Sequence, residues 1–196
     1  MIHCFVAITL STCPGMVQQI ASDTLPVPLQ INVAPEAKRW RDFVSYDGRF
    51  RALAPGDMRE KIDSIQTPLG KLAYHIFFFQ MEDPDADNVV YMITYCDYPA
   101  GVLHADSAAL LEAFFDVTVQ TAASSVRGEV LYVDDWQYKR YPGKVWRIRY
   151  LNGKALIKTR AFVVSNRYYM IQTITRRERT VNYSSDKFFD SFRLLE

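Results

Sequence analysis

The chain has 196 residues, a length that suits one domain with its own hydrophobic core and without disulfides or a structural metal. Hydrophobic residues make up 49% and charged residues 23%, and the formal net charge of +1 excludes global recruitment to nucleic acid or membranes. Three scattered cysteines, Cys4, Cys13 and Cys96, indicate neither a disulfide framework nor a zinc site.

The first 36 residues have the pattern of a leader or of a disordered tail. Ile2–Leu10 is mostly apolar, and Leu10-Ser11-Thr12-Cys13 resembles a weak lipoprotein cleavage box, but no Lys or Arg precedes Lys38. A degraded or clipped export signal and an unstructured tail both fit this stretch. The proline-containing segment Asp23–Pro35 is typical of an extended linker. We therefore expect a single folded domain over residues 37–196.

The first predicted elements of this domain are strands joined by short loops. Trp40–Leu53 contains Tyr46-Asp47-Gly48-Arg49 between two apolar stretches, and an Asp-Gly pair there is a strong hairpin signal. Leu72–Phe79 and Val89–Tyr95 are the next predicted strands, with a polar loop between them. Strands so close in sequence are expected to pair antiparallel.

Ser107–Ser125 is predicted to form a long amphipathic helix. Its apolar stripe consists of Leu110, Leu111, Phe114, Phe115, Thr118 and Ala122. Asp106 or Ser107 is expected to cap the N-terminus by accepting a hydrogen bond from a backbone N–H. Arg127-Gly128 is expected to end the helix, with the glycine in the left-handed conformation.

Four more strands are predicted after this helix: Glu129–Val133, Val145–Tyr150, Ala155–Val164 and Tyr168–Thr175. Their expected turns are Tyr141-Pro142-Gly143, a tight primed turn at Asn152-Gly153, and Ser165-Asn166-Arg167. A short helix is expected from Ser184 or Ser185. This order predicts an α+β fold, in which an antiparallel meander sheet of six to seven strands is covered by helices as an α/β/α sandwich.

Five phrases occur in a recognisable order along the domain. They are Ala54-Pro55-Gly56, Thr67-Pro68-Leu69-Gly70, Tyr95-Cys96-Asp97-Tyr98-Pro99, Tyr141-Pro142-Gly143-Lys144 and the closing phrase Phe188–Leu194. Together they resemble an uncharacterised family of small, mostly exported bacterial proteins with a PsbP-like fold. PsbP is the extrinsic subunit of photosystem II, and a Ran-binding nuclear import factor shares this fold. The resemblance implies an extracytoplasmic location and no catalytic residues.

Few side chains in the domain have the chemistry of a catalytic site. Catalysis by His75 or His104 would require a partner carboxylate or nucleophile. Cys96 lies beside Asp97, and nearby negative charge disfavours the reactive thiolate. Asp97 and Asp190 favour structural hydrogen bonds, although two carboxylates that meet can form an acid/base pair. An unrecognised hydrolase-type site near Asp97, His104 and Cys96 is the alternative.

Asp83, Asp85 and Asp87 alternate like the start of an EF-hand loop. That loop needs a glycine and a glutamate at positions that here hold Asn88 and Thr94. A solvated hairpin loop is the favoured interpretation, and a weak divalent-cation site is the alternative. No cofactor motif is found, so we expect neither a cofactor nor a metal.

Basic residues gather in the part of the chain that follows the long helix. If the strands around Asn152-Gly153 pair, one sheet face carries four of them: Arg147, Arg149, Lys158 and Arg160. Such a patch could bind an acidic protein or another anionic partner, whereas the alternative is neutralisation by the acidic N-terminal half. Nucleic acid is disfavoured, because Trp146 and Tyr150 are expected to face away from these arginines.

The sequence therefore predicts a non-enzymatic binding or assembly-support module in an extracytoplasmic location, with peripheral attachment to a membrane through a lipid on Cys13 as an option. A hydrolase-type enzyme and a cytosolic protein-interaction module are the alternatives.

Overall fold

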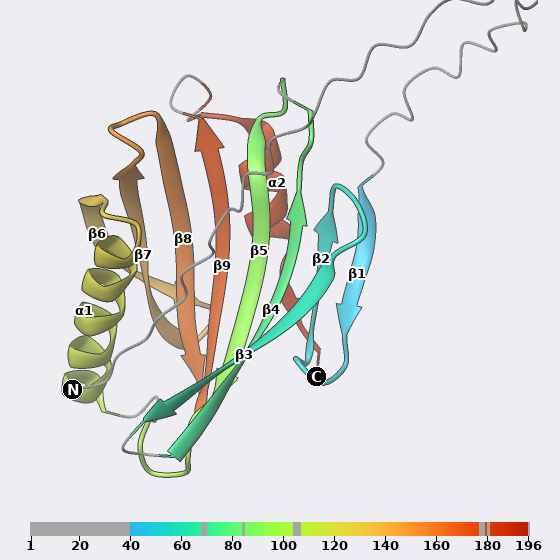
Figure 1. Cartoon of the computed structure of the whole chain (residues 1–196). Helices are drawn as coiled ribbons and strands as arrows, with labels where there is room; N and C mark the ends of the chain where they lie inside the picture. Colours follow the sequence, from blue (N-terminus) through green and yellow to red (C-terminus); the bar gives the residue numbers. More distant parts are fainter. Residues whose placement is uncertain are drawn as a thin grey trace, which may run out of the picture.

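The computed structural model describes residues 40–67, 70–83, 85–103, 107–176, 179 and 181–195 (Figure 1). The expected leader at 1–36 and the domain start at residue 37 lie outside these residues. The strands are β1 (Arg41–Ser45), β2 (Phe50–Ala54), β3 (Arg59–Thr67), β4 (Gly70–Gln80), β5 (Asn88–Asp97), β6 (Glu129–Tyr138), β7 (Tyr141–Tyr150), β8 (Ala155–Val164), β9 (Arg167–Arg176) and β10 (Arg193–Leu194). The helices are α1 (Ala108–Ser125) and α2 (Tyr183–Ser191).

Seven strands form one antiparallel sheet in the order β3-β4-β5-β9-β8-β7-β6. It consists of two meanders, β3 to β5 and β6 to β9, that join where β5 pairs with β9 and Tyr95 lies opposite Tyr169. The predicted α+β class and antiparallel sheet are confirmed. Because β5, β8 and β9 lie inside the sheet and both faces are covered, most of their residues are buried, and buried residues follow one another along each strand instead of alternating with exposed ones.

The predicted long helix is confirmed as α1, and Ser107 caps it by accepting a hydrogen bond from the backbone N–H of Leu110. The alternative cap, Asp106, lies outside the described residues. The buried side of α1 is rotated slightly from the predicted stripe and consists of Leu111, Phe115, Thr118, Val119 and Ala123. These residues join the core on one face of the sheet, and Figure 1 shows α1 lying over the end formed by β6 and β7.

The end of α1 differs from the prediction in which residue is left-handed. Arg127 has the positive φ of 51°, whereas Gly128 donates its N–H to the carbonyl of Ala123. Gly128 is required for a different reason: a Cβ at this position would lie 2.5 Å from a side-chain carbon of Ile148 on β7. The glycine therefore permits close approach of the chain to the sheet.

The opposite face of the sheet is covered by α2 together with a small three-stranded sheet of order β1-β2-β10. The predicted Asp-Gly hairpin is confirmed as β1 and β2, but it forms this separate sheet instead of joining the main one. Phe50 of β2 stacks on Phe192 at 5.3 Å between ring centroids, and the Ser191 hydroxyl accepts a hydrogen bond from the Leu53 N–H. The closing segment Phe188–Leu194 therefore has a packing role.

Two predicted turns were wrong. Pro142 and Gly143 lie inside β7, because the turn between β6 and β7 is formed by Lys139 and Arg140. Gly143 is needed there since a Cβ would collide with the carbonyl oxygen of Ala161 on β8. The Asn152-Gly153 connection is a four-residue loop from Leu151 to Lys154, not a two-residue turn.

Strand β3 was not predicted from the sequence. It is the edge strand of the main sheet, and most of its residues are exposed on both faces. A strand with so little buried surface carries no clear alternation of apolar and polar residues. Among the described residues, no helix is long and apolar enough to cross a bilayer.

Candidate functional site

The four basic residues predicted to share a face do so. Arg147 on β7 lies opposite Lys158 on β8 in the register, and the remaining two are two residues away along the same strands. Because side chains two residues apart on a strand point to the same side, all four lie on the face that α2 covers. We call Arg147, Arg149, Lys158 and Arg160 the β7–β8 basic face.

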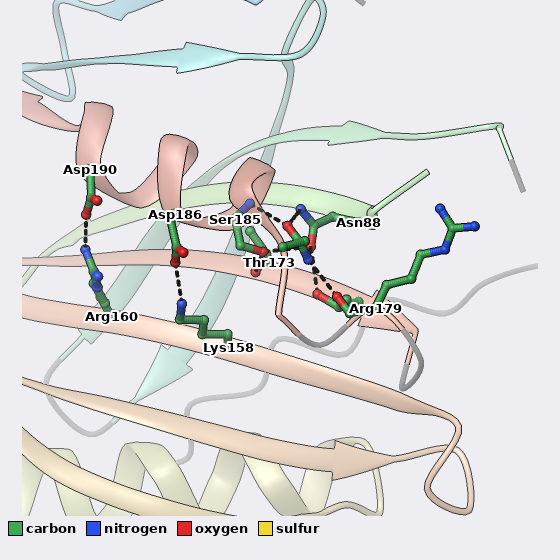
Figure 2. A network of polar contacts seen from close by, with 10 residues as sticks. Asn88, Lys158, Arg160, Thr173, Arg179, Ser185, Asp186 and Asp190 are labelled. Atoms are coloured by element: carbon green, nitrogen blue, oxygen red, sulfur yellow. Dashed lines mark hydrogen bonds and ion pairs between the residues drawn. The ribbon is translucent and has the colours of Figure 1, made fainter. Parts of the chain in front are cut away.

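Two of these cations are paired with carboxylates of α2, as Figure 2 shows. Lys158 Nζ lies 2.9 Å from Asp186 Oδ1, and Arg160 Nη1 lies 2.8 Å from Asp190 Oδ1. Helix α2 packs against β5 and β9, and the long side chains of Lys158 and Arg160 on the neighbouring strand β8 reach its carboxylates. The pairs help to orient α2 on the sheet, and both are partly solvated.

The other two cations lie nearer the edge of the sheet. Arg149 pairs with Glu129 of β6 at 2.5 Å, and the guanidinium of Arg147 lies 5.4 Å above the ring of Tyr132. Within the described part of the chain, Arg147 has no carboxylate partner. The acids come from β6 and α2, so the expected neutralisation by the acidic N-terminal half was wrong. Whether this face binds a partner stays a prediction.

Asp97 and Asp190 do not form a pair. Arg167 of β9 binds both oxygens of Asp97, with Nε to Oδ1 and Nη2 to Oδ2 each at 2.6 Å, whereas Asp190 binds Arg160. A two-pronged arginine pair of this kind fixes geometry as well as charge. Each carboxylate is thus engaged in a separate ion pair.

Arg167 connects the strand-end phrase to the first hairpin. It donates a third hydrogen bond, at 2.7 Å, to the carbonyl of Asp47, and its guanidinium lies 4.7 Å from the centre of the Tyr95 ring. The hydrogen bonds to Asp97 hold the pKa of Arg167 above its ordinary value. Burial, more than any other factor, raises the pKa of Tyr95 to about 12. Arg167 therefore joins the end of β5, through Asp97, to the β1–β2 hairpin, through Asp47.

The residues proposed for a hydrolase-type site do not converge where the structure describes them. Cys96 is fully buried in the core beneath α1, whereas the next residue, Asp97, points to the opposite face. His75 stacks on Tyr95 at 4.5 Å and lies 3.1 Å from a carboxylate oxygen of Glu60. His104 lies outside the described residues.

Asp83, Asp85 and Asp87 turn to three different partners. Asp83 accepts a hydrogen bond from the backbone N–H of Asp85, which itself contacts Arg179, and Asp87 accepts one from the Ser184 hydroxyl. In the described ranges, no group of three or more His, Cys, Asp or Glu residues could hold a metal ion.

A buried polar network, missed by the sequence analysis, fixes the N-terminus of α2 (Figure 2). Asn88 is fully buried, and its Oδ1 accepts hydrogen bonds from Thr175 at 2.7 Å and Ser185 at 2.8 Å. Its amide nitrogen donates to the Tyr91 hydroxyl at 2.9 Å and to Asn182 at 3.2 Å. Asn182 also caps α2 by accepting from the Ser185 N–H. The sequence analysis placed Asn88 in a polar loop, and no sequence pattern predicted that it is buried.

A cavity of about 190 Å³ lies on the other face, between α1 and the sheet. We call it the α1-face cavity. Its walls come from the C-terminal half of α1 and from strands β3, β4, β5, β7, β8 and β9. Tyr150 lines it, so this ring does face away from the β7–β8 basic face, and Trp146 is fully buried on the same side. No pattern in the sequence predicts this cavity.

Comparison with known proteins supports the fold. No family model and no curated protein matches the sequence. Among solved structures, the chain is similar to the solution structure of cyanobacterial PsbP (CyanoP) from Synechocystis sp. PCC 6803. The TM-score is 0.50 at 12% sequence identity, over 83% of this chain and 95% of that chain. The predicted PsbP-like fold is therefore confirmed, and the likeness concerns the fold alone.

Proposed function

We propose that this protein is a non-enzymatic binding or assembly-support module that acts outside the cytoplasm. The observation that carries the proposal is the separation of the reactive side chains: Cys96 is buried beneath α1, and Asp97 is held by Arg167 on the opposite face. A nucleophile and a general base must lie within hydrogen-bond reach of one another. The PsbP-like fold, taken as an analogy, supports a role in holding partners.

The extracytoplasmic location is supported by the sequence. Leu10-Ser11-Thr12-Cys13 resembles a lipoprotein cleavage box, and the domain phrases resemble those of a mostly exported bacterial family. A lipid on Cys13 would attach the domain to a membrane surface through the segment that precedes Trp40.

We place the partner contact on the β7–β8 basic face. Arg147 is the member of this face that keeps its charge without a carboxylate partner in the described ranges, and Arg149 is paired only with a solvated glutamate. An acidic protein surface is the partner that such a face fits, because complementary charge steers association and fixes its orientation.

Two measurements on the native protein test the proposal. Mass spectrometry of the mature N-terminus should find a chain that is cleaved or lipidated at Cys13, and an unprocessed N-terminus would exclude the proposed location. Cross-linking in intact cells should join Lys154, in the exposed loop between β7 and β8, to an acidic protein, and the Arg147→Glu variant should lose that product. The Arg51→Glu variant, changed on the small sheet instead, is the matched control. An unchanged product from Arg147→Glu would exclude the β7–β8 basic face.

A further inference from the structure

The α1-face cavity is large for a protein interior. Interiors are packed to the density of organic crystals, and few voids exceed the size of a water molecule. An apolar cavity of about 150 Å³ holds one benzene molecule. The volume here is about 190 Å³, and a molecule of about 8 to 10 non-hydrogen atoms fits such a space.

Most of the cavity wall is apolar. The sheet contributes apolar side chains that include Phe78, Val90, Met92, Ile157, Met170 and Ile174. Two of these are methionines, whose unbranched and polarizable side chains adapt to ligands of different shape. Lys61 and Gln80 also line the cavity and are exposed, so they mark the side that opens to solvent, towards β3 and β4.

The wall contains a buried threonine hydroxyl that lacks a hydrogen bond. Thr94 is fully buried, and its Oγ1 has no partner among the described residues. Buried hydroxyls nearly always find a partner, so this exception requires an explanation. Thr118, which also lines the cavity, donates its hydroxyl to the carbonyl of Phe114 at 2.7 Å. Of these two threonines in the cavity wall, Thr118 has a hydrogen-bond partner within the protein and Thr94 does not.

A second polar group lies close to Thr94. Gln172 of β9 is opposite Met92, so it is diagonal to Thr94 across the β5–β9 pair. Its amide nitrogen donates to the hydroxyl of Thr159 at 2.9 Å, which fixes the amide, and its carbonyl oxygen has no partner among the residues described. The wall therefore presents a hydroxyl and a carbonyl oxygen within an apolar surround.

We propose that the α1-face cavity binds a small, uncharged, mainly apolar molecule whose hydroxyl or carbonyl oxygen completes the hydrogen bond of Thr94. The ligand is uncharged because the one ionic side chain in the wall, Lys61, is paired with Asp63 at 2.9 Å, and an unpaired buried charge is costly. This inference rests on the proposed function, because the molecule is held without being converted.

Two matched probes test the proposal with the purified chain. The probes are 4-ethylphenol and ethylbenzene, which differ by one hydroxyl, and isothermal titration measures both dissociation constants. The Thr94→Val variant removes the hydroxyl of the wall at constant shape. In this variant, we expect the dissociation constant of 4-ethylphenol to rise about fivefold relative to that of ethylbenzene. The comparison is with the same ratio in the unmodified protein. The Thr118→Val variant is the control and should leave this ratio unchanged, since its hydroxyl already serves the helix.

A second variant tests the location independently of Thr94. Ala122 of α1 lines the cavity and is half-buried, so Ala122→Phe should fill the space and abolish binding of both probes. Failure of both probes to bind the unmodified chain at millimolar concentration, or an unchanged ratio in Thr94→Val, would overturn the inference. Recovery of a chemically altered probe would instead contradict the non-enzymatic function, while binding of the probe in the cavity would still hold.

Discussion

Asn88 is the residue whose replacement should most directly test how α2 is held on the sheet. Asn88→Ala removes an acceptor shared by Thr175 and Ser185 and a donor to Tyr91, all of which are buried. Ser185 keeps a second contact, at 3.3 Å, with the hydroxyl of Thr173. Thr175 therefore loses the partner that satisfies it, and Tyr91 loses one hydrogen bond but keeps the one to Ser184.

The expected loss follows from these two groups. A buried polar group left without a partner costs about 1 to 3 kcal/mol, and the loss of one hydrogen bond costs about 0.5 to 1.5 kcal/mol, so Asn88→Ala should lower the free energy of unfolding by about 3 kcal/mol. For a chain of this length, each kcal/mol shifts the melting temperature by about 2 to 4 °C. The midpoint of thermal unfolding should thus fall by about 6 to 12 °C.

Urea denaturation followed by circular dichroism measures this loss, and an unchanged m-value shows that the unfolded states are comparable. Asn182→Ala is the first control: it removes the half-buried cap of α2 and should cost about 1 kcal/mol. Asp186→Asn is the second, because it removes a partly solvated ion pair to Lys158 and should cost less than about 1 kcal/mol. If Asn88→Ala costs no more than Asn182→Ala, the network does not hold α2 as we infer.

Three further predictions follow from single positions. Thr94→Val should raise the free energy of unfolding by about 1 kcal/mol, because it removes a buried hydroxyl that lacks a partner; a loss in urea denaturation would contradict this. Gly143→Ala should cost about 2 kcal/mol or more, because its Cβ collides with the Ala161 carbonyl, and wild-type stability would disprove that close contact. Tyr95 has a folded-state pKa of about 12 against an ordinary 10, so its contribution to stability is complete below pH 10 and is lost as the pH rises to 12. Urea denaturation between pH 10 and 12 should show this decline, and Tyr95→Phe should make it shallower; an equal slope in both proteins would count against it.

Much of the secondary structure could be predicted because it depends on local patterns. The apolar residues of α1 recur at helical spacing, and the Asp47-Gly48 pair favours a turn in any context. The missed elements were those without such a pattern. Strand β3 is exposed on both faces, and β10 has only two residues, Arg193 and Leu194. Gly143 resembled a turn residue because its close approach to β8 is not visible in its neighbours along the chain.

The candidate sites depended much less on local patterns. The sequence placed the four basic residues on one face, because side chains alternate along a strand, but it did not indicate that α2 supplies acids to Lys158 and Arg160. It also did not identify Asn88 or Thr94 as buried polar residues, because their surroundings come from distant parts of the chain. Asn88, for example, contacts Ser185, which lies 97 positions away.

The amino-acid sequence by itself determined the helices, most strands and the antiparallel class, because backbone sterics impose periods of 3.6 and 2 on neighbouring residues. Only the tertiary structure decided that β5 pairs with β9, that the first hairpin leaves the main sheet, and that α1 leaves a cavity over β4, β5 and β9. These features depend on how distant segments close and pack against one another, and the free energy of such contacts is distributed over many residues instead of being written in any one stretch.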